Sequence, residues 1–270
     1  ALCKNTTGNS NVALGISALF ANTTADNNTA IGKQALTSNT TGTRNVAVGC
    51  GALLSNVNDN DNTGVGFATL VNSSGQSNTA VGSSALNSNT TASNNTAVGY
   101  YALEANTTGC QSSAVGSSAL AANTEGCFNT AVGYNALLSN TTADRNTAVG
   151  MSSLSSTTTG CCNTALGQGT MSANTTGDNN VAIGTLALST AQTADNNTAV
   201  GFKSLEANTS GAGNTAVGKD SLISNTTGGT NTAVGLCSLN ANTTADNNTA
   251  VGRGALKLNT TGASNVGVGR

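Results

Sequence analysis

Cysteine is the residue type in this sequence that is best suited to covalent chemistry. The chain contains seven: Cys3, Cys50, Cys110, Cys127, Cys161, Cys162 and Cys237. Because the number is odd, they cannot all pair within one chain. No C-x-x-C spacing of the kind that binds zinc occurs. Chance occupancy of variable surface positions is the simplest interpretation for most of them.

Other side chains that could do chemistry are sparse. The chain has no His, which excludes a His-based catalytic triad and the usual zinc sites. The carboxylates are scattered singly; Asp178 and Asp195, 17 residues apart, could hold a cation weakly, but solvated charges explain them better. The "GQG" at 167–169 reads as a turn, since no helix follows to bind phosphate. We therefore expect no enzyme activity, cofactor or metal site.

A repeat of 17 residues organises the whole chain. A glycine closes each phrase of the type "NTAVG" at sixteen places from Gly15 to Gly269, and every step is 17 residues except one of 16 at 71–75. The unit is N-T-A-V-G-x-x-A-L-x-x-N-T-T-(G/A)-x-x, whose places we number as positions 1 to 17. The residues that share one position form a column. Sixteen copies at a fixed period indicate a repeat architecture.

A β-solenoid is the architecture that fits this unit. Seventeen residues are too few for a pair of packed helices. Positions 2 and 4 are mostly β-branched, which is the alternation of a short strand, and glycine punctuates the turns. Parallel stacking of one strand per coil at about 4.8 Å predicts an all-β, parallel β-solenoid (β-roll) of sixteen coils. We interpret 1–270 as a single repeat domain and as a fragment of a longer repeat fibre.

Each column suggests the side of the coil that it faces. Eighteen of the twenty charged residues fall at positions 6, 7, 10, 11, 16 and 17, with Asp59 and Glu125 as exceptions, so these six columns should face water. We expect columns 4 and 9 to face inward as the structural core, where burial is worth about 25 cal/mol per Å². Representative core residues are Val48, Leu53, Val132, Leu137, Val200 and Leu205.

Column 3 holds only small residues: Ala in fourteen copies and Gly in two. On a strand this position points away from positions 2 and 4. If those face inward, a neighbouring chain packed on column 3 would explain its small size. This predicts a homo-oligomer, most simply a cyclic trimer, with interface candidates Ala30, Ala80, Ala131, Ala199 and Ala250. A monomer whose flat sheet favours small residues is the alternative.

The asparagine columns at positions 1 and 12 have a mechanical explanation. Stacked Asn side chains can form hydrogen-bonded ladders, and they also bond their own backbone in turns. The predicted ladder at position 1 includes Asn28, Asn45, Asn129, Asn146 and Asn231. In such a stack Cys110 and Cys127 are one coil apart, about 4.8 Å, which makes them a candidate disulfide.

The phrases "NVALG", "NTAIG", "NTAVG" and "NVAIG" resemble the head repeats of trimeric autotransporter adhesins. The longer stretch 129–150 is also similar to shaft repeats of phage-type tail fibres that end in a self-cleaving chaperone domain. The resemblance covers the whole chain. It implies a trimeric β-roll on a cell or virion surface, although the 17-residue period and the seven cysteines depart from the adhesin pattern.

Composition restricts the partners. The net charge of −2 and the lack of a basic stripe argue against nucleic acid. No apolar run is long enough to insert in a membrane. The expected partners are other copies of the chain, and a surface glycan or host receptor for an adhesive fibre.

We therefore interpret the chain as a non-catalytic structural or adhesive segment of an extracellular fibre: a surface adhesin, a tail-fibre shaft or a secreted filament. Two alternatives remain. One is ice binding through Thr and Asn columns, with pairs such as Asn89 and Thr91 on one face. The other is glycan binding on Tyr100, Tyr101 and Tyr134.

Overall fold

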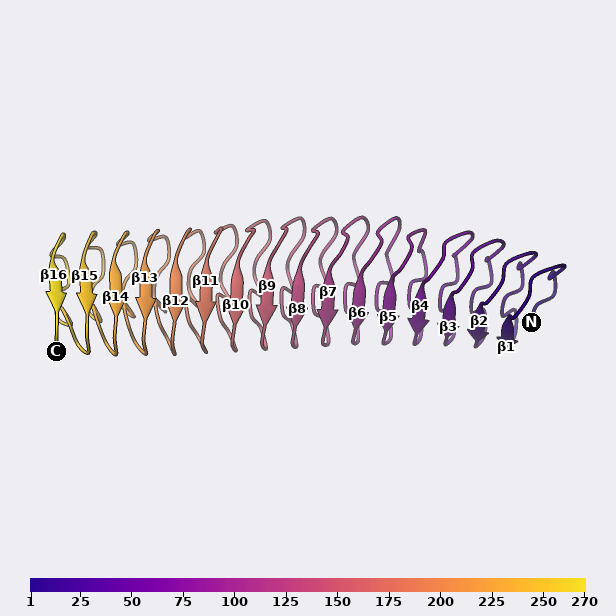
Figure 1. The fold of residues 1–270 in the computed structure, drawn as a ribbon, viewed down its shortest axis with the longest axis horizontal. Helices are drawn as coiled ribbons and strands as arrows, with labels where there is room; N and C mark the ends of the chain where they lie inside the picture. The colour runs from indigo at the N-terminus through magenta and orange to yellow at the C-terminus, as the bar shows by residue number, and fades with distance from the viewer. The chain divides into compact units, whose positions relative to one another are not determined.

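A computed structural model describes residues 1–270. The chain divides into two compact units, Ala1–Ala131 and Val132–Arg270, and each is described by itself. Both are built from short parallel strands, one per coil, with turns between them and no helix. In Figure 1 the strands within each unit lie side by side in chain order. Each unit is therefore a parallel β-solenoid. One repeat domain over 1–270 stays a prediction.

The first unit contains seven complete strands, each of three residues. They pair in the order of the sequence, each with the next. The strands are β1 (Val12–Leu14), β2 (Thr29–Ile31), β3 (Val46–Val48), β4 (Thr63–Val65), β5 (Thr79–Val81), β6 (Thr96–Val98) and β7 (Ser113–Val115). The division between the units falls within β8 (Thr130–Val132).

The second unit repeats the same arrangement, again with neighbouring strands paired in parallel. Its complete strands are β9 (Thr147–Val149), β10 (Thr164–Leu166), β11 (Val181–Ile183), β12 (Thr198–Val200), β13 (Thr215–Val217), β14 (Thr232–Val234), β15 (Thr249–Val251) and β16 (Val266–Val268).

Neighbouring coils are joined in strict register. Strands pair position for position, as Ala199 with Ala216 and Val200 with Val217. Hydrogen bonds between coils continue outside the strands; for example, the Leu205 N–H donates to Ser221 O at 3.0 Å. The backbone polar groups of the turns are thus satisfied by the next coil, which is what burial of irregular backbone requires.

The inner and outer sides of the strands are opposite to the sequence prediction. The interface candidates Ala30, Ala80, Ala131, Ala199 and Ala250 have no exposed surface in the single chain. They face the interior of their own coil. They therefore cannot be the surface that contacts another chain.

Column 4 was also assigned to the wrong side. Val132 is 38% exposed, and Val48 and Val200 are half-buried. Column 9 does form the core, since Leu53, Leu137 and Leu205 are fully buried.

The reason is space within the narrow coil. A Cβ placed on Gly64, at position 3, would lie 2.8 Å from Thr69 Oγ1 in column 8 and 3.6 Å from Leu53 Cγ in column 9. Columns 8 and 9 together therefore leave room for no more than a methyl group on the inner side of each strand. Column 8, which is mostly Ala and Ser, fills the remaining interior.

The core leucines have an unusual backbone conformation. Every residue in column 9 has a positive φ, for example 53° at Leu205 and 48° at Met171. This left-handed region is strongly unfavourable for β-branched side chains. The conformation explains why column 9 is Leu or Met and never Val or Ile, although all four are apolar.

Position 5 must be glycine for two reasons. Gly201 has a φ of +134°, and a Cβ built there would lie 2.6 Å from Gly218 O of the next coil. Any side chain would therefore force neighbouring coils apart.

The shortened coil keeps the register of the sheet. Strands β4 and β5 still pair Thr63 with Thr79 and Gly64 with Ala80. The missing residue is absorbed in the turn, where Ser73 is buried in the place of the position 12 asparagine.

Candidate interaction surface

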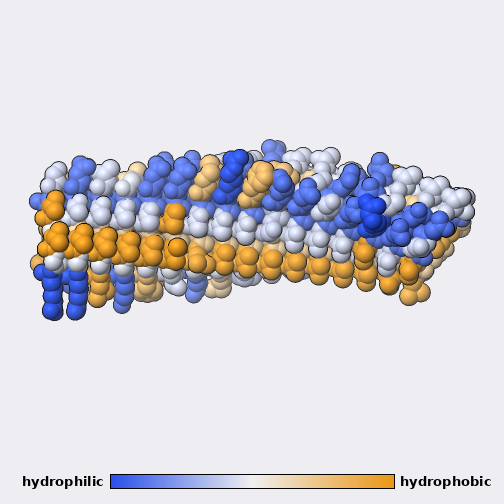
Figure 2. All heavy atoms as spheres, in the orientation of Figure 1, coloured by the Kyte–Doolittle hydropathy of each residue, from blue (hydrophilic) through white to orange (hydrophobic).

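The outward side of the strands, which we call the strand face, consists of columns 2 and 4. Column 2 is Thr in eleven coils, Val in four and Ser in one, and column 4 is Val, Ile or Leu throughout. Figure 2 shows a row of hydrophobic side chains over the strands of each unit. Column 4 residues with substantial exposure are Leu14, Ile31, Val98, Val115, Val132, Leu166, Ile183, Val217, Val234, Val251 and Val268.

The strand face carries no charge in any coil, whereas eighteen of the twenty charged residues stand on the turn columns 6, 7, 10, 11, 16 and 17. Both sets of columns are accessible to solvent. Solvent exposure alone would permit charges on either. The strand face and the turn columns therefore differ in composition although both are exposed.

Two physical arguments indicate that such a face is normally covered. Sheets made only of parallel strands occur almost entirely with both faces buried, and here only the inner face is covered by the chain. A row of about eight partly exposed aliphatic residues per unit also presents on the order of several hundred Å² of apolar surface. The largest apolar patch on a typical monomer has a similar size and is often functional.

The column 1 asparagines link successive coils. Each side-chain Oδ1 accepts the backbone N–H of the next asparagine, as from Asn45 to Asn28 at 2.9 Å. The Nδ2 of Asn28 donates to Gly42 O at 2.8 Å. The same backbone bond joins Asn163 to Asn146 and Asn231 to Asn214. In the coil before Asn129 a serine takes the asparagine's place, and the Asn129 N–H donates to Ser112 Oγ at 3.2 Å.

The column 12 asparagines form a true amide ladder. Asn39 Nδ2 donates to Asn22 Oδ1 at 3.1 Å and also to Gly42 O at 2.9 Å. Where the column is interrupted, a buried acceptor loses its partner. Asn174 Oδ1, which precedes Ala191 in the column, accepts no hydrogen bond. Such a loss costs about 1–3 kcal/mol.

Column 16 has a structural role that the sequence reasoning missed. Where the side chain in this column has an acceptor atom, it can accept the backbone N–H of the same position one coil earlier. Asp195 accepts from Asp178 and Asp246 from Gly229, both at 2.7 Å. The frequent Asp, Asn and Ser at this position were the available signal. The pair Asp178 and Asp195 is thus explained by hydrogen bonding within the stack.

Two carboxyl groups in the first unit have shifted pKa values. Burial raises the pKa of Asp59, which occupies position 15, where Gly or Ala usually stands. The Arg44 guanidinium donates to both oxygens of Asp61 at 2.6 and 2.8 Å, and this hydrogen bonding lowers the pKa of Asp61. The two side chains of that ion pair are exposed to solvent and belong to the turn columns.

The tyrosines predicted as glycan platforms lie on turn columns. Tyr100 and Tyr101 have ring centroids 3.9 Å apart with a tilt of 43°. Hydrogen bonding with Tyr101 raises the pKa of Tyr100. In the second unit Tyr134 is exposed in column 6. The first two therefore form one small aromatic surface.

The cysteines predicted to be neighbours are brought together. Cys110 Sγ and Cys127 Sγ lie 2.7 Å apart, and the Cys110 N–H donates to Cys127 Sγ at 2.9 Å. Cys3 and Cys50 are exposed. Burial, with hydrogen bonding to Cys162, raises the pKa of Cys161 to about 11, which makes it a poor nucleophile.

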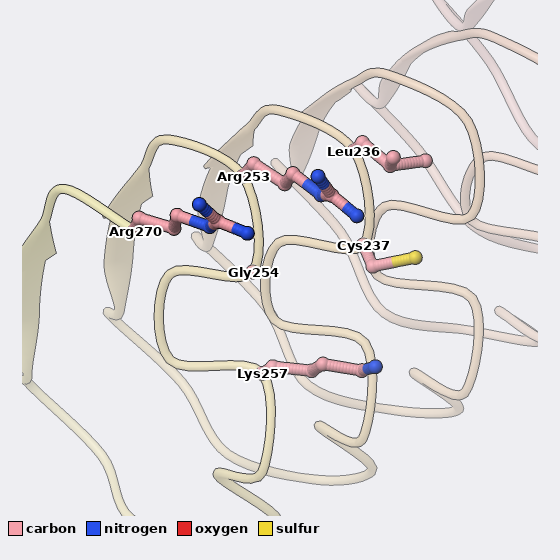
Figure 3. A pocket seen from close by; sticks show the side chains of 6 residues that line it. All are labelled: Leu236, Cys237, Arg253, Gly254, Lys257 and Arg270. Carbon is pink, nitrogen blue, oxygen red and sulfur yellow. The ribbon is translucent and has the colours of Figure 1, made fainter.

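A shallow hollow of about 310 Å³ lies in the second unit near the end of the chain. Figure 3 shows that Arg253, Arg270 and Lys257 line it together with Leu236, Gly254 and Cys237. Three cations without a carboxylate among them give the hollow a positive potential. The repeat pattern did not predict this hollow.

No cluster of three or more His, Cys, Asp or Glu side chains is arranged to hold a metal ion. The structure contains no helix that is both long and apolar enough to cross a bilayer. Comparison with protein-family models gives no match, and comparison with curated proteins gives none either.

Proposed function

We propose that this chain is a structural, non-catalytic segment of an extracellular fibre, in which copies of the chain pack against one another through their strand faces. The observation that carries the proposal is the strand face itself: thirty-two outward side chains in columns 2 and 4 without one charge. The turn columns, which carry the charges, stay in contact with solvent and with whatever the fibre meets.

A second copy of the chain is the occupant that best fits this face. The face repeats with every coil, so a partner must offer contacts at the same spacing. Another copy does so automatically, because its strands have the same separation of about 4.8 Å. Closed symmetry then allows every copy to bury the same surface.

Three copies around a common axis are the arrangement we favour. The repeat resembles the heads of trimeric autotransporter adhesins and the shafts of phage-type tail fibres. The interface differs from the one expected from the sequence: the aliphatic side chains of column 4 replace the alanines of column 3. The threonines of column 2 would lie beside this row of apolar contacts between chains.

An adhesive role belongs to the turn columns. Tyr100 and Tyr101 offer a small aromatic surface, and the hollow at Arg253 offers positive charge. These features suit a surface glycan or a host receptor, the latter with an acidic group. They are local, whereas the strand face extends through every coil.

Paired substitutions test the proposed interface. Val217 and Val234 on the strand face are each 37% exposed, and Phe202 and Leu236 in column 6 of the same region are 43% and 39% exposed. We expect Val217→Asp with Val234→Asp to place carboxylates in the proposed interface between chains and to dissociate the oligomer. Phe202→Asp with Leu236→Asp should leave it intact, because column 6 faces solvent.

Mass from light scattering gives the readout, and circular dichroism checks that both variants keep their strands. Equal masses for the two variants would contradict an interface on the strand face. A variant that loses its strands is replaced by Val217→Thr with Val234→Thr, which keeps the β-branched shape and should weaken association.

A second candidate function is ice binding. The Asn and Thr pair predicted for it does not form an exposed face, because Asn89 is buried and donates to Ala92 O. The strand face offers a different surface, with Thr and aliphatic side chains in regular rows. Thermal hysteresis of the purified chain distinguishes this function, since a fibre segment with a covered strand face should show none.

A further inference from the structure

The column 1 asparagines are interrupted once, at Ser112. Elsewhere in the first unit the side-chain amide reaches a carbonyl of the following coil, as Asn95 does to Gly109 O at 2.8 Å. Serine has no amide and is shorter. The Ser112 hydroxyl instead donates to Cys110 O at 3.3 Å within its own segment. This coil therefore lacks the amide bond that Asn95 makes to the following coil.

The cysteine pair lies beside that interruption. Cys110 is two residues before Ser112, and Cys127 occupies the same position one coil later. Their sulfur atoms are 2.7 Å apart, and both side chains are half-buried. Neighbouring coils place equivalent Cα atoms about 4.8 Å apart, within the range that a disulfide spans.

We propose that Cys110 and Cys127 form a disulfide that ties two adjacent coils together where the asparagine bond is missing. The oxidant is a disulfide of small-molecule or protein origin. One cysteine thiolate attacks it, forms a mixed disulfide and releases one thiol. The second cysteine thiolate attacks the protein sulfur of that mixed disulfide and releases the second thiol. Two electrons and two protons pass to the oxidant.

Four of the other five cysteines are poor competitors for this reaction within the chain. Cys161 and Cys162 are adjacent in sequence, and the raised pKa of Cys161 keeps it protonated near neutral pH. Cys3 and Cys50 are exposed in different coils, several repeats apart. The proposed link depends only on the stacking of coils within the first unit, and it holds whether or not chains associate.

The full chain, reduced and then treated with oxidised glutathione, provides the test. Remaining thiols are blocked, and the protein is cut after Glu and Arg. Because Glu104, Glu125 and Arg145 are available, the two cysteines fall on separate peptides with no other cysteine. We expect these peptides to be joined and to separate on reduction. Stable glutathione adducts on both cysteines, or links mainly to other cysteines, would overturn the proposal.

A stability measurement tests whether the disulfide replaces the bond between coils that Ser112 cannot make. Oxidation should raise the urea midpoint of the wild-type chain. It should raise it less in Ser112→Asn, which restores the missing amide bond, and not at all in Cys127→Ser. An equal rise in the wild-type chain and Ser112→Asn would contradict a link between the disulfide and the interrupted column.

Discussion

The two faces of each strand are both free of charge, but for different reasons. The inner face carries Ala or Gly because the column 9 leucines fill the coil and leave no space. The outer face carries Thr and Val where space is open and substitution would cost the single chain little. Uniform composition on the inner face therefore reports packing within the coil, while on the outer face we propose that it reflects contact with other copies of the chain.

Enlarging a side chain on each face should separate the two causes most clearly. Ala199→Leu adds three carbon atoms to a filled interior and should lower the free energy of unfolding by about 3 kcal/mol. Val200→Leu, one residue away on the outer face, is the matched control, since Leu166 occupies the same column. Urea denaturation of both variants measures the difference. Equal losses would contradict the assignment of the faces.

The next largest effect concerns the backbone conformation of the core leucines. Leu205→Ile keeps the side-chain volume but places a β-branched residue at a φ of 53°. We expect a loss of about 2 kcal/mol. Leu205→Met should cost less than half as much, because Met171 already occupies this column with a φ of 48°. If isoleucine were tolerated as well as methionine, the left-handed core conformation would be wrong.

Repairing the amide ladder should stabilise the interior. Ala191→Asn places an amide between Asn174 and Asn208 and gives the buried Asn174 Oδ1 a donor. A gain of about 1 kcal/mol is expected. Ala191→Asp is the control, because it has the same shape without the N–H groups and should destabilise the chain. A thermal melt that ranks the two in the opposite order would rule out the ladder.

The smallest effect concerns pH. Burial raises the folded-state pKa of Asp59, so the folded state binds this proton more tightly than the unfolded state. The resulting penalty is absent below the unfolded pKa and grows as pH rises through the folded pKa. Asp59→Asn should remove this dependence and stabilise the first unit at neutral pH. Unfolding curves at pH 3 and pH 7 would show a gap between variant and wild type that widens with pH.

The spacing of the residues was sufficient to predict the parallel β-solenoid, because a 17-residue period with one β-branched alternation admits few other structures. The alternation could not show which side of the strand is inside. An alternation with a period of two shows which residues share a face of the strand, but it does not show which face is buried. If the wrong face is chosen, every residue of the strand is assigned to the wrong side. Apolarity favoured Val132 as core over Ala131, yet the narrow coil admits only the smaller residue.

Other features depended on backbone geometry and hydrogen bonding, which cannot be read from the amino-acid composition. The preference for Leu over Ile in column 9 follows from a positive φ, which is visible only in the backbone. The role of column 16 as a hydrogen-bond acceptor was hidden because its side chains are also those expected at a solvated surface. The pairing of Cys110 with Cys127 was predicted as a candidate disulfide, since it required only the period.

The mass of the chain in solution, measured by light scattering with reductant present, tests the central claim that the strand face is covered by other copies. We predict a mass three times that of the 26.2 kDa chain, which Val217→Asp with Val234→Asp reduces to that of one chain. A wild-type chain that remains monomeric at all concentrations would contradict the account, and would leave the strand face exposed to water.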